Sequence, residues 1–333
     1  MRDPAFWWRQ PGLAGALLSP LGAIYGAVAG ARMARPGRNA GVPVICIGNL
    51  TLGGAGKTPA AILVAQILAG AGRKPFVLSR GYGGALAGPV RVDPATHGAA
   101  DVGDEPLLLA QSAPVIVARD RAAGANAARA AGAGSIVMDD GFQSPNLHKD
   151  LSILVADGPR GVGNGAVFPA GPLRAPLEAQ LDRAQALLVM GEHLHVRPVL
   201  AHAIARKLAV LHGRLEPDAE ALAMLQRKPV LAFAGIGDPD KFFSTLAVAG
   251  IDVRVRLPFP DHHRFSGSEA AGIVARARRD GLVVVTTEKD MARLAGDNDA
   301  ADLKAAARTL PVRLVVAEDA EFRKLVLGAA GAA

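Results

Sequence analysis

Residues 48–59 have the residue types and spacing of a phosphate-binding loop. They read Gly-Asn-Leu-Thr-Leu-Gly-Gly-Ala-Gly-Lys-Thr-Pro and follow an apolar run at 44–47. Glycines let backbone N–H groups turn toward phosphates, and a helix that starts at the loop adds partial positive charge at its N-terminus. Lys57 can reach the β- and γ-phosphates, and the Thr58 hydroxyl can bind Mg²⁺. We expect a nucleoside triphosphate to bind to Thr51, Gly53, Gly54, Ala55, Gly56, Lys57, Thr58 and Pro59.

One position departs from the generic form of this loop. A glycine usually stands five residues before Gly56, and this chain has Thr51 there. Gly53 and Gly54 supply the flexibility that the missing glycine would give. The alternative is a glycine-rich turn that only connects a strand to a helix, but Gly-Lys-Thr at a helix start favours the phosphate loop.

Two adjacent carboxylates, Asp139 and Asp140, follow another apolar run at 135–138. Carboxylates that a strand delivers to the phosphate end of a sheet can hold Mg²⁺, directly or through water. Alone, Asp-Asp-Gly is an ordinary turn after a strand, but the preceding phosphate loop favours the magnesium interpretation. These motifs predict nucleotide binding with Mg²⁺ and leave the phosphate acceptor open.

Short β-branched runs alternate with helical stretches from residue 42 onward, which is typical of right-handed crossovers and a mostly parallel sheet. A first set of strands is expected at 44–47, 76–79, 115–118, 135–138 and 153–156, with helices at 57–69 and 122–131. A second set is expected at 230–234, 253–257, 282–286 and 312–316, with helices at 239–249, 267–279 and 319–327. Segment 157–228 would join them, rich in Gly and Pro early and helical later. We therefore predict two α/β lobes with a ligand cleft between them.

Residues 1–40 are both basic and apolar. They hold five arginines and one acid, and residues 10–31 carry no charge. As a helix, 10–31 would reach ~33 Å, about one hydrocarbon core, although Pro20 and five glycines weaken it. Trp7, Trp8 and Tyr25 suit a lipid–water boundary. We expect helices that lie on or dip into a membrane; a spanning helix, a core hairpin and a secretory signal are the alternatives.

Composition excludes several classes of protein. Half of the 333 residues are apolar and a fifth are charged, so the chain is not intrinsically disordered. The single cysteine, Cys46, excludes a disulfide framework and a cysteine-based zinc site, and suggests a reducing compartment. The net charge of +7 suits an anionic membrane surface or ligand. Nucleic acid is disfavoured because basic and aromatic residues are not interleaved.

Eight segments occur in a fixed order along the chain. After the loop at 48–59 come Leu-Ser-Arg-Gly-Tyr-Gly-Gly at 78–84, Gly-Asp-Glu-Pro at 103–106, Asp-Arg at 120–121 and Asp-Asp-Gly-Phe-Gln at 139–143. These are followed by Phe-Pro-Ala-Gly-Pro-Leu-Arg at 168–174, Phe-Pro-Asp-His-His-Arg-Phe at 259–265 and Thr-Thr-Glu-Lys-Asp at 286–290. This set resembles the tetraacyldisaccharide 4′-kinases, the lipid A 4′-kinases of Gram-negative bacteria, over nearly the whole chain.

The resemblance implies an activity: with ATP and Mg²⁺, phosphorylation of the 4′-hydroxyl of a tetraacylated glucosamine disaccharide 1-phosphate, which gives lipid IVA in lipopolysaccharide biosynthesis. It implies a site at the cytoplasmic face of the bacterial inner membrane, and neither nucleic acid nor an obligate protein partner. The expected fold is a Rossmann-like phosphate-loop domain at 41–228, a smaller Rossmann-like α/β domain at 229–333 and a membrane-associated helical segment at 1–40. In this family the position of Thr51 is usually not glycine.

The resemblance also implies a catalytic pair. Asp104 precedes an apolar run and by spacing alone would be a helix N-cap, but the family motif there is linked to catalysis, so Asp104 is expected to accept the proton of the attacking hydroxyl. Glu105 would be an acid that binds the metal or supports a residue that does. His262 is expected to orient Asp104 and tune its pKa, with His263 as the less favoured partner. An exposed loop and a metal-binding Asp-His-His are the alternatives for 261–263.

Six further residues are expected to contact substrate or phosphate, because they lie in the resembling motifs: Asn49, Arg80, Tyr82, Arg121, Gln143 and Arg174. Guanidinium groups suit phosphates because they bind two oxygens at once. Lys289 and Asp290 either face the nucleotide base or ribose, or cap a helix. The cluster Glu192-His193-Leu194-His195 is interpreted as a solvated loop.

Other phosphate-loop proteins are the rival interpretations. A GTPase usually carries Asn-Lys-x-Asp, which this chain lacks, and a kinase for a soluble metabolite would not need the apolar N-terminus. Another membrane-associated kinase, or a membrane-tethered nucleotide switch that binds a partner, remains as the alternative. A switch would need no base near the γ-phosphate.

Overall fold

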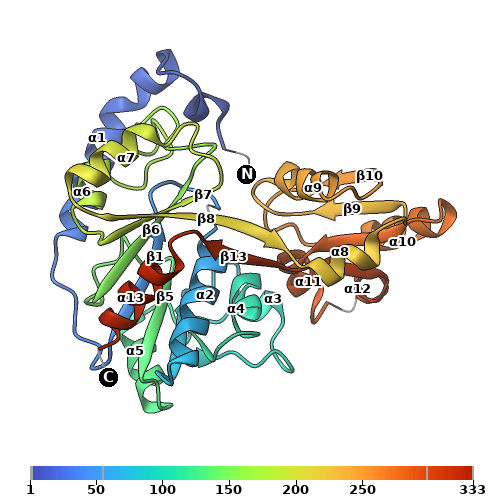
Figure 1. Cartoon of the computed structure of the whole chain (residues 1–333), viewed down its shortest axis with the longest axis horizontal. Coiled ribbons are helices and arrows are strands. Elements are labelled where there is room, and N and C mark those ends of the chain that lie inside the picture. The colour runs from blue at the N-terminus through green and yellow to red at the C-terminus, as the bar shows by residue number, and fades with distance from the viewer. Residues whose placement is uncertain (1–2, 55, 298, 332–333) are drawn as a thin grey trace.

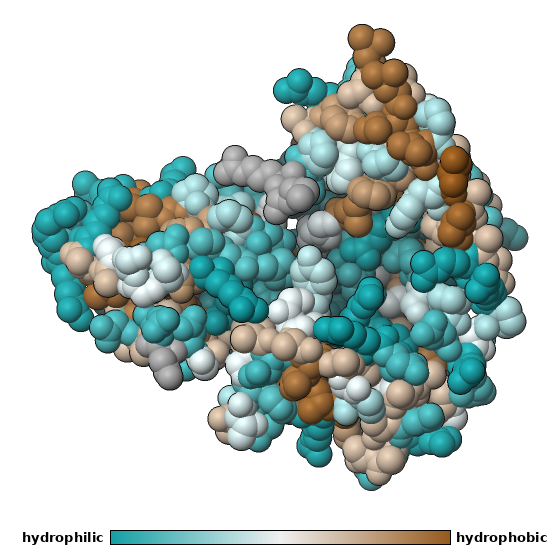
Figure 2. Space-filling view, turned by 180° about the vertical axis from the view of Figure 1, so that it is seen from behind, coloured by the Kyte–Doolittle hydropathy of each residue, from teal (hydrophilic) through white to brown (hydrophobic). Residues whose placement is uncertain are grey.

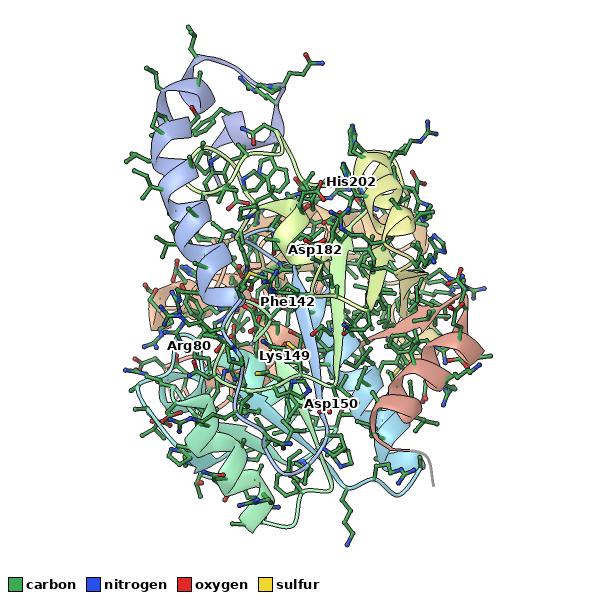
Figure 3. The ribbon with its side chains drawn as sticks, turned by 90° about the vertical axis from the view of Figure 1, so that its left-hand side faces the viewer. Arg80, Phe142, Lys149, Asp150, Asp182 and His202 are labelled. Atoms are coloured by element: carbon green, nitrogen blue, oxygen red, sulfur yellow. The ribbon has the colours of Figure 1, made fainter. Side chains whose placement is uncertain are left out.

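The computed structural model describes residues 3–54, 56–297 and 299–331. A large α/β lobe, a smaller α/β lobe and an N-terminal helix make up the molecule (Figure 1). The two lobes lie side by side, and the N-terminal helix runs along the large lobe on the side away from the small one (Figures 1 and 3).

The large lobe is built on a nine-stranded sheet in the order β13-β8-β7-β6-β1-β5-β2-β4-β3. The pairs β13–β8 and β3–β4 are antiparallel and the others are parallel. The strands are β1 Val44–Asn49, β2 Pro75–Ser79, β3 Val90–Arg91, β4 Val115–Val117, β5 Ser135–Asp139, β6 Leu151–Asp157, β7 Ala186–Met190, β8 Ala209–Pro217 and β13 Val312–Val316. Every residue of β1, β5 and β6 is buried, as expected of parallel strands covered on both faces.

Helices cover both faces of this sheet. One face carries α2 (Lys57–Gly70), α4 (Asp104–Leu109) and α13 (Asp319–Ala329), and the other carries α5 (Arg121–Ala130), α6 (Leu177–Leu181) and α7 (Arg197–Ala205). The short helix α3 (Ala99–Val102) precedes α4. The carboxyl ends of β1 and β5 thus lie beside the start of α2, where ligands bind in open α/β sheets.

The small lobe has a four-stranded parallel sheet in the order β10-β9-β11-β12. Its strands are β9 Val230–Ala234, β10 Val253–Pro258, β11 Val283–Thr287 and β12 Ala307–Leu310. One face packs against α8 (Ala219–Leu225) and α9 (Pro239–Val248). The other packs against α10 (Gly267–Arg279), α11 (Glu288–Leu294) and α12 (Ala301–Ala306). Both lobes are α/β with mostly parallel sheets, as predicted.

Two expectations about chain organisation are wrong. The segment 157–228 does not only join the lobes, because β7 and β8 within it belong to the large sheet. The strand at 312–316 was expected in the second lobe, but β13 pairs antiparallel with β8, and Leu314 and Val316 pack into the large-lobe core. The chain therefore returns to the large lobe after residue 310. An apolar run predicts a strand but does not determine which sheet the strand joins.

A single helix, α1 (Leu13–Met33), follows the short 3₁₀ helix η1 (Ala5–Trp8) and continues through Pro20. Proline cannot donate the backbone hydrogen bond to the carbonyl four residues earlier. In this helix the Ser19 hydroxyl donates to that carbonyl, Ala16 O, at 2.8 Å. Pro20 was expected to weaken the helix, but it does not interrupt it, and the carbonyl left without its backbone donor is bonded by a neighbouring side chain.

The helix α1 turns its small residues toward the large lobe. A Cβ at Gly22 would lie 2.8 Å from the Val167 carbonyl oxygen, and one at Gly26 would lie 3.3 Å from Pro176. Among the described residues, α1 is the one helix long and apolar enough to cross a membrane, and only 11% of its most apolar window is buried. A buried core hairpin is therefore wrong, and the helix is compatible with membrane association.

Candidate functional site

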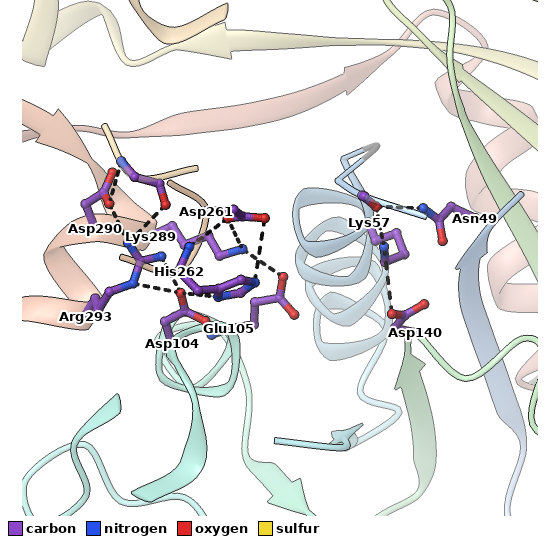
Figure 4. Close-up of polar contacts among 12 residues, drawn as sticks. Asn49, Lys57, Asp104, Glu105, Asp140, Asp261, His262, Lys289, Asp290 and Arg293 are labelled. Carbon is purple, nitrogen blue, oxygen red and sulfur yellow. Dashed lines mark hydrogen bonds and ion pairs between the residues drawn. The ribbon is translucent and has the colours of Figure 1, made fainter. Parts of the chain in front are cut away.

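The phosphate loop joins β1 to α2. Gly53 and Gly56 have φ angles of 94° and 87°, a region that favours glycine. The Asn49 side-chain amide donates to Gly53 O at 2.9 Å, and Lys57 Nζ donates to the same oxygen at 3.4 Å. These contacts connect the two ends of the loop through Gly53 and hold the buried Lys57 side chain against it (Figure 4).

Asp140 lies between two cations at the end of β5. Its carboxylate is 3.9 Å from Lys57 Nζ, and Arg174 donates to both its oxygens at 2.6 and 3.2 Å. Arg174 Nε also donates to Thr51 O at 2.9 Å, which ties Asp140 to the loop. Burial alone would raise the pKa of Asp140, but Lys57 and Arg174 outweigh it and lower that pKa. Burial lowers the pKa of Lys57, and Asp140 opposes that shift.

Asp139 is the buried member of the carboxylate pair. Its Oδ1 has no hydrogen-bond partner among the described residues, and neither has Asn49 Oδ1. Burial raises the pKa of Asp139 to about 7, with further contributions from the charges of Glu105 and Asp140. Unpartnered carboxylate and amide oxygens beside a phosphate loop fit Mg²⁺, which takes one or two carboxylates together with phosphate and water oxygens.

A second group of charged side chains gathers on Asp104, the first residue of α4 (Figure 4). His262 Nδ1 lies 3.0 Å from Asp104 Oδ2, and Arg293 donates to the same oxygen through Nη2 at 2.5 Å and Nε at 3.2 Å. Asp104 belongs to the large lobe, whereas His262 and Arg293 belong to the small one. The site is therefore assembled where the two lobes meet.

Lys289 supplies another link between the lobes. Its Nζ lies 3.2 Å from Glu105 and 3.7 Å from Asp261. Burial alone would lower the pKa of Lys289, but Glu105, Asp104 and Asp261 raise it overall. Burial alone would raise the pKa of Asp104, but the hydrogen bond from His262 and the charges of Lys289 and Arg293 hold it well below its usual range. Asp104 is thus kept ionised.

The two groups face each other across the junction of the lobes. Figure 4 shows Lys57 and Asp140 on one side and Asp104 with His262 on the other, with Glu105 extending toward Lys57. The charge of Glu105 acts on Lys57 and on Asp139. A Cβ at Gly237 of the small lobe would lie 3.9 Å from Gly54 N, so the small lobe also approaches the phosphate loop.

Other expected site residues have different surroundings. Arg121 is buried and donates to the carbonyls of Leu78 and Asp139 at 2.9 and 3.0 Å, so the expectation that it contacts phosphate is corrected: its guanidinium joins the ends of β2 and β5. Gln143 donates to Asn49 O at 2.9 Å and so stabilises the start of the loop. Arg80 is exposed on the surface seen in Figure 3.

The other expected site residues are those of the phosphate loop, the two histidines and Tyr82. Thr58 and Pro59 lie in the first turn of α2, and Ala55 lies outside the described residues. His263 contacts Glu269 at 3.3 Å rather than Asp104, so His262 is the partner of Asp104. The Tyr82 ring lies against His262 with centroids 5.3 Å apart.

Asp290 has a structural position rather than one facing a nucleotide. It accepts from Gly235 N at 3.0 Å and from the Thr287 hydroxyl at 2.6 Å, and its own N–H is capped by Thr287. The loop Glu192–His195 is exposed, although His193 stacks on His212. Sequence reasoning missed Arg293; the available signal was its spacing three residues after Asp290, which places both on one side of α11.

This fold and this site define a two-lobed phosphotransferase of the phosphate-loop class. The family model described as Tetraacyldisaccharide-1-P 4′-kinase, LpxK, matches residues 14–330. A tetraacyldisaccharide 4′-kinase from Methylobacterium sp. (strain 4-46) is 56% identical over 99% of this chain and 100% of its own, and one from Rhodopseudomonas palustris (strain BisA53) is 52% identical over 100% and 97%. The chain belongs to the tetraacyldisaccharide 4′-kinase family.

A solved structure supports the same assignment. LpxK from Aquifex aeolicus, crystallised with ATP, superposes with a TM-score of 0.73 at 25% identity and covers 95% of this chain and 99% of its own. Both lobes therefore belong to the architecture that this family shares.

Proposed function

We propose that this chain transfers the γ-phosphoryl group of ATP to the 4′-hydroxyl of a tetraacylated glucosamine disaccharide 1-phosphate, giving lipid IVA. The observation that carries the proposal is the contact between Asp104 of the large lobe and His262 of the small lobe, which lies opposite Lys57 of the phosphate loop in Figure 4. A nucleotide switch would need the loop alone. Membership of the kinase family and the ATP-bound relative support the same reaction.

In this proposal the phosphate loop holds the triphosphate through its backbone N–H groups and Lys57. Thr58, Asp139 and Asp140 would hold Mg²⁺, with Glu105 close enough to add its charge. The ion supplies neutralisation of charge on the phosphate oxygens. Arg174 keeps Asp140 aligned through two hydrogen bonds, and Asn49 with Gln143 keeps the loop in shape.

The Asp104–His262 pair is proposed to take the proton of the 4′-hydroxyl. Asp104 Oδ2 and His262 Nδ1, 3.0 Å apart, form one hydrogen-bonded unit, so the proton is received by the pair. Tyr82, exposed beside His262, and Arg80 are left to contact the sugar or its 1-phosphate. Transfer then requires little covalent chemistry from the protein beyond positioning and charge neutralisation.

A lipid substrate stays in the bilayer, and α1 carries a surface that suits one. Its exposed apolar side chains recur every three or four residues, and the apolar band they form is visible along the edge of the molecule in Figure 2: Leu13, Leu17, Leu21, Ile24 and Val28. A water-soluble helix would turn such a stripe toward the core. We propose that this stripe docks the chain on the cytoplasmic face of the inner membrane, where ATP is present, with Arg32, Arg35 and Arg38 near anionic lipid.

The test compares two acceptors. Purified chain with Mg²⁺-ATP receives either the tetraacylated disaccharide 1-phosphate in detergent micelles or the same disaccharide 1-phosphate without acyl chains. Mass spectrometry with fragmentation is expected to find one added phosphate at the 4′-position of the acylated acceptor, and at least ~10-fold less on the deacylated one. ATP consumption without phosphorylation of the acylated lipid would instead support another acceptor or a switch.

A further inference from the structure

Arg293 uses all three guanidinium nitrogens in hydrogen bonds at the junction of the lobes. It is buried, and its Nη1 donates to Asp290 Oδ1 at 2.7 Å and to Gly235 O at 3.1 Å. Its Nε and Nη2 are directed to Asp104 Oδ2. Asp290, which anchors it, is itself fixed by Gly235 N and the Thr287 hydroxyl. The guanidinium is therefore held by the small lobe before it reaches Asp104.

The contacts of the Asp104 carboxylate are unequal. Oδ2 is bonded by Arg293 and His262, both from the small lobe, whereas Oδ1 accepts, among the residues that the structure describes, only the backbone N–H of Glu105 at 2.9 Å. Two guanidinium nitrogens donate to the same carboxylate oxygen, and these two hydrogen bonds restrict rotation of the carboxylate. Arg293 thus sets the orientation of Asp104 relative to His262, although it has no contact with the phosphate loop residues in Figure 4.

Charge supports the same assignment. The charges acting on Asp104 are those of Arg293 and Lys289 from α11 and of His262 from its loop. The acids Glu105, Asp261 and Asp290 pair with these cations: Lys289 contacts Glu105 and Asp261, and Arg293 contacts Asp290. Removing Arg293 would leave two buried carboxylates, Asp104 and Asp290, without their shared cation. Burial then favours the protonated form of both.

We infer that Arg293 is a positioning residue for phosphoryl transfer: it holds the carboxylate of Asp104, from the large lobe, against His262, so that the proton-accepting pair exists only when the lobes are packed together. The inference rests on the proposed function for the identity of the reaction, but the contact it describes can be tested without lipid.

The activity arm uses Arg293→Gln and Arg293→Lys, with Arg279→Gln as the control because Arg279 is an exposed arginine of α10 that pairs with its neighbour Asp280. We expect Arg293→Gln to lower kcat by ~10–10²-fold with KM for ATP changed less than ~3-fold, since ATP is held by the other lobe. Arg293→Lys keeps the charge and is expected to restore most of kcat.

A purely structural role predicts a different pattern. A lower melting temperature with unchanged kcat in both Arg293 variants would overturn the inference. Loss of kcat in Arg293→Lys as large as in Arg293→Gln would also overturn it.

The stability arm is independent of the reaction. Melting temperatures are measured for Asp104→Asn, Arg293→Lys and the double variant in the absence of lipid. Residues in direct contact give non-additive effects, so the double variant is expected to lose clearly less than the sum of the two single losses. Additive losses would overturn the inference, whereas absence of lipid phosphorylation by the unaltered chain, with non-additive losses retained, would overturn the proposed function alone.

Discussion

The charges at this site are neutralised by oppositely charged side chains from other segments of the chain. Lys57 and Asp140 neutralise each other beside the phosphate loop, and Asp104 is neutralised by Arg293 and His262. Lys57 and Asp140 could be predicted because each belongs to a short motif with a fixed local spacing, the phosphate loop and the Asp-Asp sequence. The Asp104–His262 contact joins residues 158 positions apart, and only the family resemblance suggested it. Arg293 had no such motif, so its contact with Asp104 required the folded structure.

Asp139 gives a prediction at the residue scale, because its pKa of about 7 lies above the ordinary value near 4. A carboxyl that binds its proton more tightly in the folded chain loses its contribution to stability as pH rises from about 4 to about 7. We therefore expect Asp139→Asn, without nucleotide, to raise the melting temperature by a few degrees at pH 8 and by little at pH 5.

Asp140→Asn is the matched control with the opposite sign. The pKa of Asp140 is lowered, so its ionised form stabilises the fold above the unfolded pKa, and that contribution is lost as pH falls through the folded value. Its amide variant is expected to be less stable than the unaltered chain at pH 8. Calorimetry measures the melting temperatures of both variants at pH 5 and pH 8. The same dependence on pH in both variants would contradict the opposite pKa shifts of Asp139 and Asp140.

Elements with a clear period were predicted well, and α10 and β9 have the bounds that were expected. The strands β7 and β8 were not predicted, because the glycines and prolines of 157–228 are typical of a connecting segment. The placement of β13 could not be predicted, because pairing with β8 brings together segments about 100 residues apart. For α1 the apolar composition was evident, but which face would be buried depended on the close approach of Gly22 to residue 167.

The exposed stripe of α1 leads to a prediction at the element scale. Leu17→Asp with Leu21→Asp places charges on the face proposed to enter the bilayer, where a charged side chain costs several kcal/mol. We expect co-sedimentation with vesicles of anionic phospholipid to fall by at least ~10-fold, with binding of a fluorescent ATP analogue unchanged. Val248→Asp is the control, since Val248 is 90% exposed on the small lobe and lies outside the stripe. Retained vesicle binding in the double variant would rule out α1 as the docking element.

At the scale of the whole molecule, two ion pairs join the lobes at the end of β6. Arg160 contacts Asp238 at 3.0 Å and Lys241 contacts Asp157 at 2.5 Å, while the Trp8 ring lies 5.3 Å from the Arg160 guanidinium. The N-terminal segment, the large lobe and the small lobe therefore meet at one point. Sequence patterns predicted the two lobes but contained no signal for this junction.

Removing these pairs tests their contribution to lobe packing. Partly exposed ion pairs contribute ~0.2–1 kcal/mol each, so Asp238→Asn with Lys241→Gln is expected to lower kcat by ~2–10-fold, because fewer molecules keep Asp104 and His262 in contact. Salt screens the pairs, so the difference from the unaltered chain is expected to shrink at high ionic strength. Asp319→Asn, which removes a pair within α13, is the control and is expected to change nothing. A difference that grows with salt would show that these pairs do not hold the lobes together.

The central claim is that one phosphoryl transfer uses the phosphate loop of one lobe and the acid–base pair anchored by the other. The most direct measurement follows ATP labelled in its γ-phosphate, with the label counted separately in lipid and in inorganic phosphate, for the unaltered chain, Lys57→Ala and Asp104→Asn. The unaltered chain is expected to place nearly all released label in the lipid, and each variant is expected to lose at least ~10²-fold of that rate while melting as a folded protein. Label that goes to inorganic phosphate, or lipid labelling that survives either substitution, would contradict the account.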